Sequence, residues 1–498
     1  MPRRLSLGIV LLACAASRAE ATLTISAAPT HNVSCSAGLC TTTSARGVLN
    51  ADELTAMLAS GDIAVQSTSR SKDIVVSAAV AWSSTHRLTL EAFRALIVKQ
   101  PIAVNGTSAL TIDTDTSSDS NFAFAGKGKI SFLDTASDLV INGDDYALVA
   151  DISQLTDSVT QHPTKDIALV RDYDAGPDGI YPTDPGMIFQ GTFEGLGNTI
   201  RNLKISVSLR GVHVGLFYQV GAVRHFHLDH ASVKSTGTNG TVGLLAGGCV
   251  QVSDVSVSGS VAAAPGSFVG GMCGLLGGGT VSNARAAGTV TGKGDSTSAA
   301  NGAGGLVGFL DGGLIENSSS SAKVAGDKGW IAGGLVGSTE FSVYRITGSF
   351  ATGTVTVGDD GVAGGLVGDN EGQHPVDNSY ATGFVGGGVN STVGGLIGIN
   401  DAPVADCYAT GAVSSGSGNA VGGLIGNDMG PNDLTDTYWD VETSGQSHGV
   451  GNNTNYPGVT GLTTAQFQSG LPSGFDATIW SENAGVNGGF PYLIANPQ

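Results

Sequence analysis

A short histidine-rich segment holds the residue types of a transition-metal site. Its four histidines are His213, His225, His227 and His230. In an extended strand Phe226 and Leu228 would point inward, because neighbouring side chains alternate between two faces. The side chains that would then point outward, and that could bind Zn²⁺ or another transition metal, are His225, His227 and Asp229. We favour the alternative, a solvent-exposed strand in a divergent first repeat.

A string of aspartates further upstream is typical of a calcium loop. Asp172, Asp174 and Asp178 are followed by a glycine, and clustered carboxylates around a glycine turn suit a hard cation. The closing glutamate of such a loop is missing, and Gly176 and Pro177 disturb the ligand order. We therefore favour a plain acidic turn, and we predict no metal at this position.

Two further patterns could support catalysis. Residues 445–449 match the G-x-S-x-G nucleophile elbow, but no buried strand is expected before them and no helix after them. Carboxylates suited to polysaccharide cleavage occur at Asp113, Asp115, Asp144 and Asp145, and no basic residue can be assigned to them. The H-E-x-x-H metalloprotease signature, the dinucleotide fingerprint and the P-loop are absent from the sequence. The sequence therefore predicts neither a catalytic residue nor a cofactor.

The cysteines are typical of a protein from an oxidising compartment. Cys35 and Cys40 lie five positions apart in a Ser/Thr-rich segment, where a small disulfide loop would hold the end of the fold. We expect that pair to be oxidised. Cys249, Cys273 and Cys407 lie in apolar, strand-like segments, where we expect buried free thiols.

The elements that position these side chains must be mostly strands. Glycine accounts for 76 of 498 residues and charged residues for only 13%, so strong helix formers are scarce, and glycine disfavours helix by about 1 kcal/mol per site. The hydrophobic content of 41% is sufficient for a folded core. A formal net charge of −19 leaves no basic surface for phosphates, which argues against nucleic acid and anionic membranes as partners.

One motif recurs from about residue 215 onward with a period of about 30 residues. It takes forms such as AGGLVG and VGGLIG, and its central apolar residues are Leu216, Leu244, Met272, Leu306, Leu335, Leu366, Leu396 and Leu424. A unit of short strands and Gly-rich turns cannot bury its apolar face alone, so neighbouring units must cover one another. Its glycines are expected at sharp turns or at positive φ. The sequence therefore predicts an all-β, right-handed parallel β-helix, or β-solenoid, with capped ends.

A second motif, of the type NSYATGxV, follows the first in fixed phase. It places Asn or Asp at one corner of each turn, at Asp254, Asn283, Asn317, Asn378, Asp406 and Asp436. Aromatic residues follow at Phe350, Tyr380, Tyr408 and Tyr438, and equivalent residues of successive turns should stack about 4.8 Å apart. Arg285 and Ser319 occupy the same position in earlier units, so we expect the aromatic stack to be interrupted there.

The two motifs together resemble the GLUG-motif repeats of bacterial surface and adhesin-type proteins, and the resemblance covers residues 190–498. The lead-in FEGLGNTI at residues 193–200 and the closing YWD and FPYL segments resemble the modules that bracket such arrays. Residues 48–150 alternate apolar and polar positions and resemble a filamentous-haemagglutinin-type β-helix. The resemblance implies an exported, adhesin-like β-helix protein, and it names no ligand.

Two helices are expected to interrupt the strands. Residues 50–59 are expected to form a helix that caps the open end of the solenoid, where unpaired strand edges would otherwise aggregate. Residues 151–160 are expected to form a helical insertion. The expected segments are a signal peptide (1–21), an N-terminal cap with the disulfide loop (22–60), an irregular β-helix with a short helical insertion (61–190), a GLUG-repeat β-solenoid (191–430) and a C-terminal capping module (431–498).

The first 21 residues have the form of an export signal. Two arginines precede an apolar run that ends near a small-x-small cleavage site at residues 19–21. Residues 11–14 resemble a lipobox, so a lipid anchor at Cys14 stays open as an alternative. No later stretch is long and apolar enough to span a membrane. We expect a product that is secreted, or associated with the cell surface or the outer membrane.

The leading functional hypothesis is a non-enzymatic, exported protein that binds glycans, polysaccharides or surface proteins through a repetitive surface. A ladder of equivalent weak sites gives avidity where each single site is poor. The alternatives are a carbohydrate-active β-helix enzyme and a structural envelope or matrix component. An enzyme should concentrate ionisable groups in one concave site, whereas an adhesin should spread polar residues along the coil.

Overall fold

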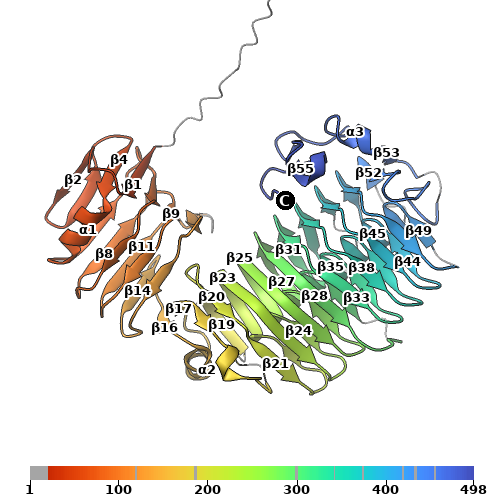
Figure 1. Ribbon diagram of the computed structural model, residues 1–498, viewed down its shortest axis with the longest axis horizontal. Coiled ribbons are helices and arrows are strands. Elements are labelled where there is room, and N and C mark those ends of the chain that lie inside the picture. The colour runs from red at the N-terminus through yellow and green to blue at the C-terminus, as the bar shows by residue number, and fades with distance from the viewer. Residues whose placement is uncertain are drawn as a thin grey trace, which may run out of the picture.

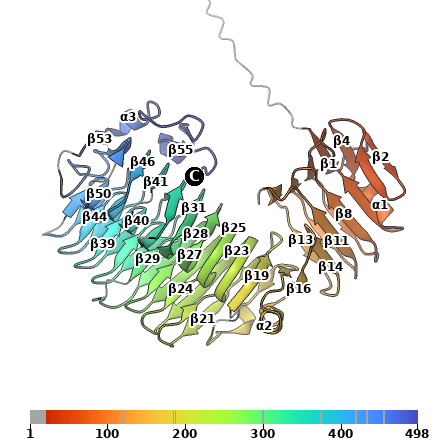
Figure 2. The ribbon, with the colours of Figure 1, turned by 180° about the vertical axis from the view of Figure 1, so that it is seen from behind.

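The chain winds as parallel strands into a curved solenoid whose two ends lie on the same concave side (Figures 1 and 2). This computed structural model describes residues 21–117, 121–183, 185, 188–297, 301–340, 342–372, 375–417, 420–430, 434–453 and 456–498. The expected all-β solenoid is confirmed. The predicted signal peptide up to residue 20 and the lipid-anchor candidate Cys14 lie outside the described residues. Among those that are described, no helix is long and apolar enough to cross a membrane.

The N-terminal part is a three-sided β-helix. One side contains β1 (Thr22–Ser26), β4 (Gly47–Asn50), β6 (Asp73–Val76), β9 (Leu96–Val98) and β12 (Phe122–Phe124). The second contains β2 (Val33–Ser36), β3 (Leu39–Thr42), β5 (Ile63–Gln66), β8 (Arg87–Glu91), β11 (Ala109–Asp113), β14 (Asp138–Ile141) and β15 (Asp144–Asp145). The third contains β7 (Val80–Trp82), β10 (Ile102–Val104) and β13 (Ile130–Phe132).

The remainder consists of one sheet of 30 strands and one of eight, with a two-stranded sheet near the C-terminus. The large sheet begins with β16 (Ala147–Val149), β17 (Ile167–Leu169), β18 (Tyr173–Asp174), β19 (Ile188–Glu194), β20 (Thr199–Arg201), β21 (Lys204–Val207), β23 (Phe217–Ser235), β25 (Ala246–Ala263), β27 (Cys273–Ser282) and β28 (Arg285–Gly292). It continues with β30 (Val307–Asp311), β31 (Gly313–Glu316), β32 (Ser319–Ser320), β33 (Lys323–Gly326), β35 (Val336–Thr339), β36 (Tyr344–Thr347), β37 (Phe350–Ala351), β38 (Val355–Val357), β40 (Val367–Asn370) and β41 (Val376–Asp377). It ends with β42 (Tyr380–Ala381), β43 (Val385–Gly387), β45 (Ile397–Asn400), β46 (Val404–Ala405), β47 (Tyr408–Ala409), β48 (Val413–Ser415), β50 (Ile425–Asp428), β51 (Leu434–Thr435), β52 (Thr437–Asp440) and β53 (Val459–Leu462).

The eight-stranded sheet supplies one further strand to each turn. Its members are β22 (His213–Val214), β24 (Thr241–Gly243), β26 (Phe268–Gly270), β29 (Gly302–Gly304), β34 (Ile331–Gly333), β39 (Val362–Gly364), β44 (Thr392–Gly394) and β49 (Ala420–Gly422). The two-stranded sheet pairs β54 (Trp480–Ser481) with β55 (Tyr492–Leu493). Strands β34 to β38 pair in order with β39 to β43. One repeat of about 30 residues is therefore one turn of the solenoid.

The apolar residues of the first motif form the inner ladder of this solenoid. Each of the eight is at most 1% exposed, and the backbone amides of Leu306 and Leu335 donate to the carbonyls of Leu335 and Leu366. Gly365 of this motif lies at a bend between β39 and β40, as expected of these glycines. Gly365 does not have a positive φ, but a Cβ there would lie 2.0 Å from the carbonyl oxygen of Gly395. Close approach of neighbouring turns therefore requires glycine at this position.

The predicted Asn and Asp corners adopt the left-handed backbone conformation. Their φ angles lie between 45° and 55° at Asp254, Asn283, Asn317, Asn378, Asp406 and Asp436. Gly348 holds this corner in another repeat, with φ 58°. Asn, Asp and Gly are the residues that reach this conformation with least strain, which explains why they recur there. The register of β23 against β25 places His225, with φ 49°, at the equivalent corner of an earlier turn.

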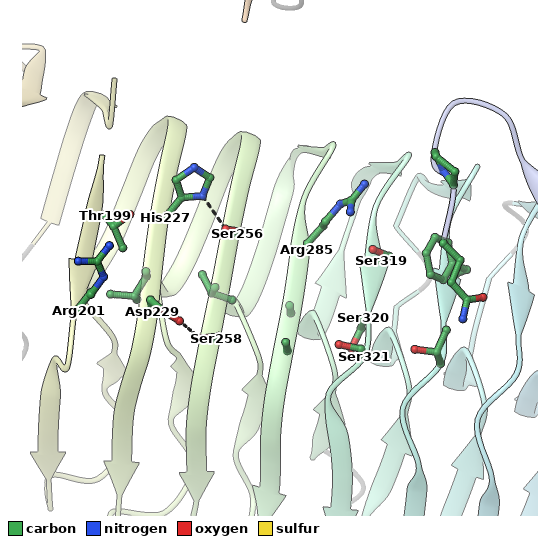
Figure 3. Close-up of a pocket in the computed structure, with 18 residues that line it drawn as sticks. Thr199, Arg201, His227, Asp229, Ser256, Ser258, Arg285, Ser319, Ser320 and Ser321 are labelled. Atoms are coloured by element: carbon green, nitrogen blue, oxygen red, sulfur yellow. Dashed lines mark hydrogen bonds between the residues drawn. The ribbon is translucent and has the colours of Figure 1, made fainter. Parts of the chain in front are cut away.

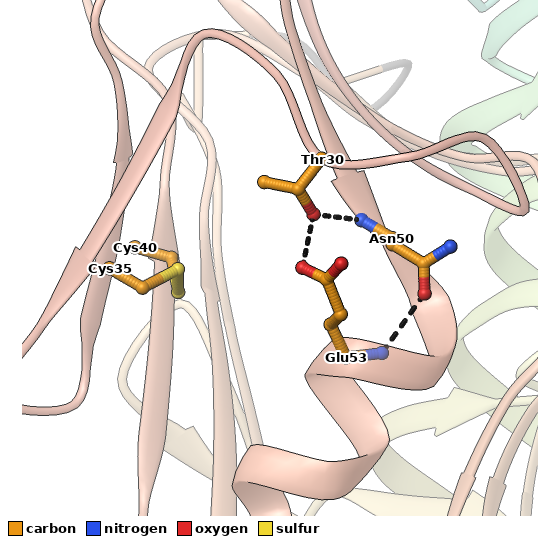
Figure 4. Close-up of a disulfide and its surroundings, with 5 residues drawn as sticks. All are labelled: Thr30, Cys35, Cys40, Asn50 and Glu53. Atoms are coloured by element: carbon orange, nitrogen blue, oxygen red, sulfur yellow. Dashed lines mark hydrogen bonds between the residues drawn. A yellow bond between two sulfur atoms is a disulfide. The ribbon is translucent and has the colours of Figure 1, made fainter.

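Both predicted helices are present. Helix α1 (Ala51–Leu58) begins after Asn50, whose side-chain oxygen accepts from the amides of Asp52 and Glu53 at 2.9 and 3.0 Å. Thr30 donates to Glu53 and fixes the preceding loop (Figure 4). Helix α1 packs against β7, the outermost strand of its sheet, and covers that edge. Helix α2 (Ile152–Gln161) follows its N-cap Asp151, and the short α3 (Thr464–Phe467) lies in the C-terminal segment. The short 3-10 helices are Gly176–Asp178 and Asn487–Gly489.

The described part of the chain contains two disulfides. Cys35 and Cys40 join the antiparallel strands β2 and β3, as expected (Figure 4). Cys249 and Cys273 form a second bond, so the expectation of free thiols is wrong at these two positions. They lie on the neighbouring turns β25 and β27 with Cα atoms 6.0 Å apart, within the range that a disulfide bridges. Cys407 is a buried free thiol, as expected.

Candidate functional site

One outward-facing position can be followed from turn to turn through the strand register. It runs through Thr199, His227, Ser256, Arg285, Ser319, Phe350, Tyr380, Tyr408 and Tyr438. This column is polar at its first five positions and aromatic at its last four. The predicted interruption of the aromatic stack at Arg285 and Ser319 is therefore confirmed.

The aromatic half of the column is covered by the C-terminal segment. The rings of Phe350 and Tyr380 are 4.9 Å apart, and those of Tyr380 and Tyr408 are 5.0 Å apart and nearly parallel. Phe467 and Trp480 pack on this stack from outside. The Tyr408 hydroxyl donates to the carbonyl oxygen of Pro491 at 2.5 Å. Strand β53 pairs with β52 of the last turn, so the segment covers a side of the solenoid as well as its end.

The polar half of the column is not covered and forms a groove of about 460 Å³. We call it the polar groove. The polar and charged side chains that line it are Thr199, Arg201, His227, Asp229, Ser256, Ser258, Arg285, Ser319, Ser320, Ser321 and Thr352. Phe350 and the chain's last residues, Pro497 and Gln498, also line it. The Asn496 amide donates to the carbonyl oxygens of Ser318 and Gly348, which fixes these last residues beside the groove.

Hydrogen bonds between side chains of neighbouring strands fix the positions of some residues that line the polar groove. His227 Nδ1 lies 2.7 Å from Ser256 Oγ, and Ser258 donates to the Asp229 carboxylate (Figure 3). Burial lowers the pKa of His227, so the imidazole is neutral at pH 7. The polar groove therefore offers a neutral, hydrogen-bonding histidine and a carboxylate that is already hydrogen-bonded.

The arginines of the polar groove differ in their surroundings. The Arg201 guanidinium lies 3.9 Å from the Asp172 carboxylate, which is also bound at 3.0 Å by Lys129. Arg285 is exposed and extends from β28 beside the groove (Figure 3). Within the described part of the chain, Arg285 makes no ion pair. Its guanidinium is available to a ligand.

The candidate metal ligands are not brought together. His225 is 5% exposed and binds Glu194 through Nδ1 at 3.0 Å, whereas His227 and Asp229 line the polar groove. The expectation that all three point outward is wrong, because the left-handed corner at His225 interrupts the alternation of the strand. Among the described residues, no group of three or more His, Cys, Asp or Glu side chains is placed to hold a metal ion.

The Glu194–His225 pair lies where the N-terminal β-helix meets the later turns. His225 Nε2 donates to the carbonyl oxygen of Phe122 at 2.8 Å, and the rings of Phe122 and Phe124 pack against the imidazole. Burial is the largest single influence and lowers the pKa of His225, but the charge and hydrogen bond of Glu194, together with Asp254 and the Phe122 carbonyl, raise this pKa overall. Both ring nitrogens face acceptors, so the geometry favours an imidazolium that joins the two parts.

The aspartates of the calcium-like string face different partners. Asp172 binds Lys129, Asp174 accepts from the Asn202 side chain at 2.8 Å, and Asp178 accepts from two tyrosine hydroxyls. These carboxylates therefore stabilise three separate contacts, as expected of an acidic turn.

Of the four carboxylates considered for polysaccharide cleavage, Asp115 and Asp144 line one pocket of about 260 Å³, and Asp113 and Asp145 do not. Tyr146, Glu194 and Arg224 line the same pocket. Arg224 is the basic residue that the sequence did not reveal, because it lies about 80 residues further along and reaches Asp144 only through the stacking of turns.

The G-x-S-x-G string has no elbow geometry. Strand β52 ends at Asp440, residues 441–449 form turns and irregular backbone, and no helix follows Ser447 in the described stretch to residue 453. Arg201 and Glu194 are further residues that sequence reasoning missed. Aligning the repeats backward past residue 215 is the signal that would have placed Arg201 beside Asp229.

One stretch of the repeat region matches a known family model. Residues 299–325 match the model of the GLUG motif. The chain is a β-solenoid that contains the GLUG motif. A search of curated proteins found no match.

Two solved structures are similar to parts of this chain. A candidate immunoglobulin A1 protease from Bacteroides ovatus shares 16% identity over 70% of this chain and 93% of its own, with a TM-score of 0.37. An IgA1 protease shares 17% identity over 57% of this chain and 21% of its own, with a TM-score of 0.36.

Proposed function

We propose that this GLUG-repeat protein is exported and acts as a non-enzymatic, adhesin-like protein that binds a surface glycan or polysaccharide chain in its polar groove. The observation that carries this proposal is the outward column, which is open over its polar half and covered over its aromatic half. A covered column could not take a ligand, whereas the open part presents a hydroxyl, imidazole or guanidinium group at each strand spacing of about 4.8 Å. Hydroxyl, imidazole and guanidinium groups are hydrogen-bonding partners for sugar hydroxyls.

Two observations support export. The two disulfides, Cys35–Cys40 and Cys249–Cys273, suit an oxidising compartment. The N-terminal sequence has the form of a cleaved signal, with lipidation at Cys14 as the alternative. Cell fractionation tests this part, and a product confined to the cytosol would contradict it.

A glycan array with the purified chain tests the binding proposal. We expect binding to at least one polysaccharide, and a Ser256→Trp substitution that fills the polar groove should abolish it. Ser44→Trp, on an exposed N-terminal loop, is the matched control and should bind normally. Binding that survives Ser256→Trp would exclude the polar groove as the site.

A second candidate function is polysaccharide cleavage in the pocket lined by Asp115, Asp144 and Arg224. The observation that favours it is the gathering of carboxylates and a basic residue in one hollow, the arrangement expected of a carbohydrate-active enzyme. Turnover of a polysaccharide that is lost in Asp144→Asn and kept in Asp134→Asn would establish this function. Binding without turnover would support the adhesin-like proposal.

A further inference from the structure

We infer that the ligand of the polar groove is an acidic polysaccharide, whose carboxylate or sulfate groups are bound by Arg285. This inference rests on the proposed function and names the class of its ligand. It follows from three features of the polar groove: its charge, its row of hydrogen-bonding side chains and the aromatic ring at its far end.

The charge of the polar groove differs from that of the chain. The protein has 42 acidic and 23 basic residues, so most of its surface repels anions. Among the side chains that line the groove, the one carboxylate, Asp229, accepts a hydrogen bond from Ser258 and lies 3.5 Å from His230. Arg285 makes no ion pair among the described residues, although Asp254 lines a neighbouring pocket with it. A planar guanidinium binds carboxylates and sulfates through paired hydrogen bonds, so an anion is the ligand that complements this side chain.

The hydrogen-bonding side chains of the polar groove indicate that the anionic group belongs to a sugar. The ladder from Thr199 to Ser319 crosses five neighbouring strands, a span of about 19 Å at one strand spacing per step. That length accommodates several sugar units. Each step offers a side chain that can donate to or accept from a ring hydroxyl, and His227, neutral at pH 7, adds to them without adding charge.

The far end of the polar groove is apolar. Phe350 ends the aromatic stack, lines the groove and is followed by covered rings. Pro497 and Thr352 also line the groove. Phe350 lies two turns beyond Arg285 and is 6% exposed, so the groove combines anion binding near Arg285 with an apolar contact to the part of this ring that faces the groove. The bound chain would lie along the solenoid axis, from Thr199 toward Phe350.

The test is isothermal titration with three polymers: polygalacturonate, which carries carboxylates, chondroitin sulfate, which also carries sulfates, and neutral dextran. We expect one or both acidic polymers to bind with an affinity that falls as salt rises, because the contact includes an ion pair. Arg285→Ala should weaken that binding at least tenfold, and Arg285→Lys should restore part of it. Arg70→Ala, at another exposed arginine, should bind as the wild type does. Melting curves of all variants confirm that the chain is folded.

The outcomes separate this inference from the proposed function. Preference for polygalacturonate identifies a carboxylate ligand, and preference for chondroitin sulfate identifies a sulfate ligand. Equal binding of dextran, with no effect of Arg285→Ala, would overturn the acidic ligand and leave the glycan-binding proposal intact. Binding of none of the three polymers, together with no hit on the glycan array, would overturn both.

Discussion

Buried ionisable side chains give this solenoid a stability that depends on pH. Burial raises the pKa of Asp369 to about 7, and the nearby carboxylates of Glu371 and Asp401 add to the effect. The folded chain then binds a proton at Asp369 more tightly than the unfolded chain, whose pKa is near 3.8. The stability contributed by this proton is present at low pH and is lost as the pH rises from about 4 to 7.

Asp369→Asn should therefore stabilise the protein at pH 8, by up to about 4 kcal/mol, and have little effect at pH 4. The amide cannot ionise, so the desolvation cost of the buried carboxylate disappears. Urea unfolding at both pH values measures the difference. Asp134→Asn, at an exposed carboxylate, is the control and should change stability equally little at each pH. A variant less stable than the wild type at pH 8 would contradict this assignment.

The Glu194–His225 pair has the same sign of pH dependence for a different reason. Its contribution is full when His225 is protonated, and it is lost as the pH rises through the raised pKa of the folded state. Glu194→Gln should destabilise the chain by about 3 kcal/mol at pH 6. Hydrogen exchange should then increase first at Phe122–Phe124 and around His225, where the two parts meet. Unchanged exchange there would show that the pair does not hold this junction.

At the level of single residues, the sequence predicted the positions that recur from repeat to repeat and missed those that do not recur. Arg285 and Ser319 were correctly placed because repeats on both sides define their column. His225 was misplaced because only the strand register shows that it occupies an Asx corner. The Cys249–Cys273 bond was missed because its residues lie at different positions of neighbouring repeats, so comparing equivalent positions does not pair them.

The turns of the solenoid interact mainly with their neighbours, so damage to one turn should stay local. Gly365→Val places side-chain atoms against the Gly395 carbonyl and Ala381. It should destabilise its turn by about 3 kcal/mol and increase hydrogen exchange first around residues 335–396. Residues 50–140 should stay protected. Gly277→Val is the matched control, because a Cβ at Gly277 meets nothing within 4 Å. Uniform loss of protection would indicate one cooperative core and contradict the solenoid energetics.

The elements were predicted more completely than the site. Both longer helices were found from their capping residues, Asn50 and Asp151, since a cap is a local signal. The covering of Tyr380 and Tyr408 by the C-terminal segment was not predicted, because it depends on contacts between residues far apart in sequence. The polar groove exists only where that covering stops, so it could not be found without the fold.

For the whole molecule, the cysteines allow a direct test of export. If the chain is cleaved after residue 21, five cysteines remain, and the structure pairs four of them and leaves Cys407 buried. Alkylation of protein isolated from its native compartment should label no cysteine in the folded state and one after unfolding, as measured by mass spectrometry. Five labelled cysteines after unfolding would indicate a reducing compartment. A lipid-modified peptide that begins at Cys14 would instead establish the lipoprotein alternative.

The Cys249–Cys273 bond has a mechanical consequence for a chain that is held at one end and pulled at the other. Under tension the turns would unfold one after another from an end of the solenoid, because each turn is stabilised mainly by its neighbours. The two cysteines are 24 positions apart in sequence, a distance of about 80 Å when the chain is extended. The residues between them cannot lengthen the tether while the bond is intact. While the bond is intact, the end-to-end length of the stretched chain is therefore shorter. Reduction of the bond would increase that length by this amount, with both ends still attached.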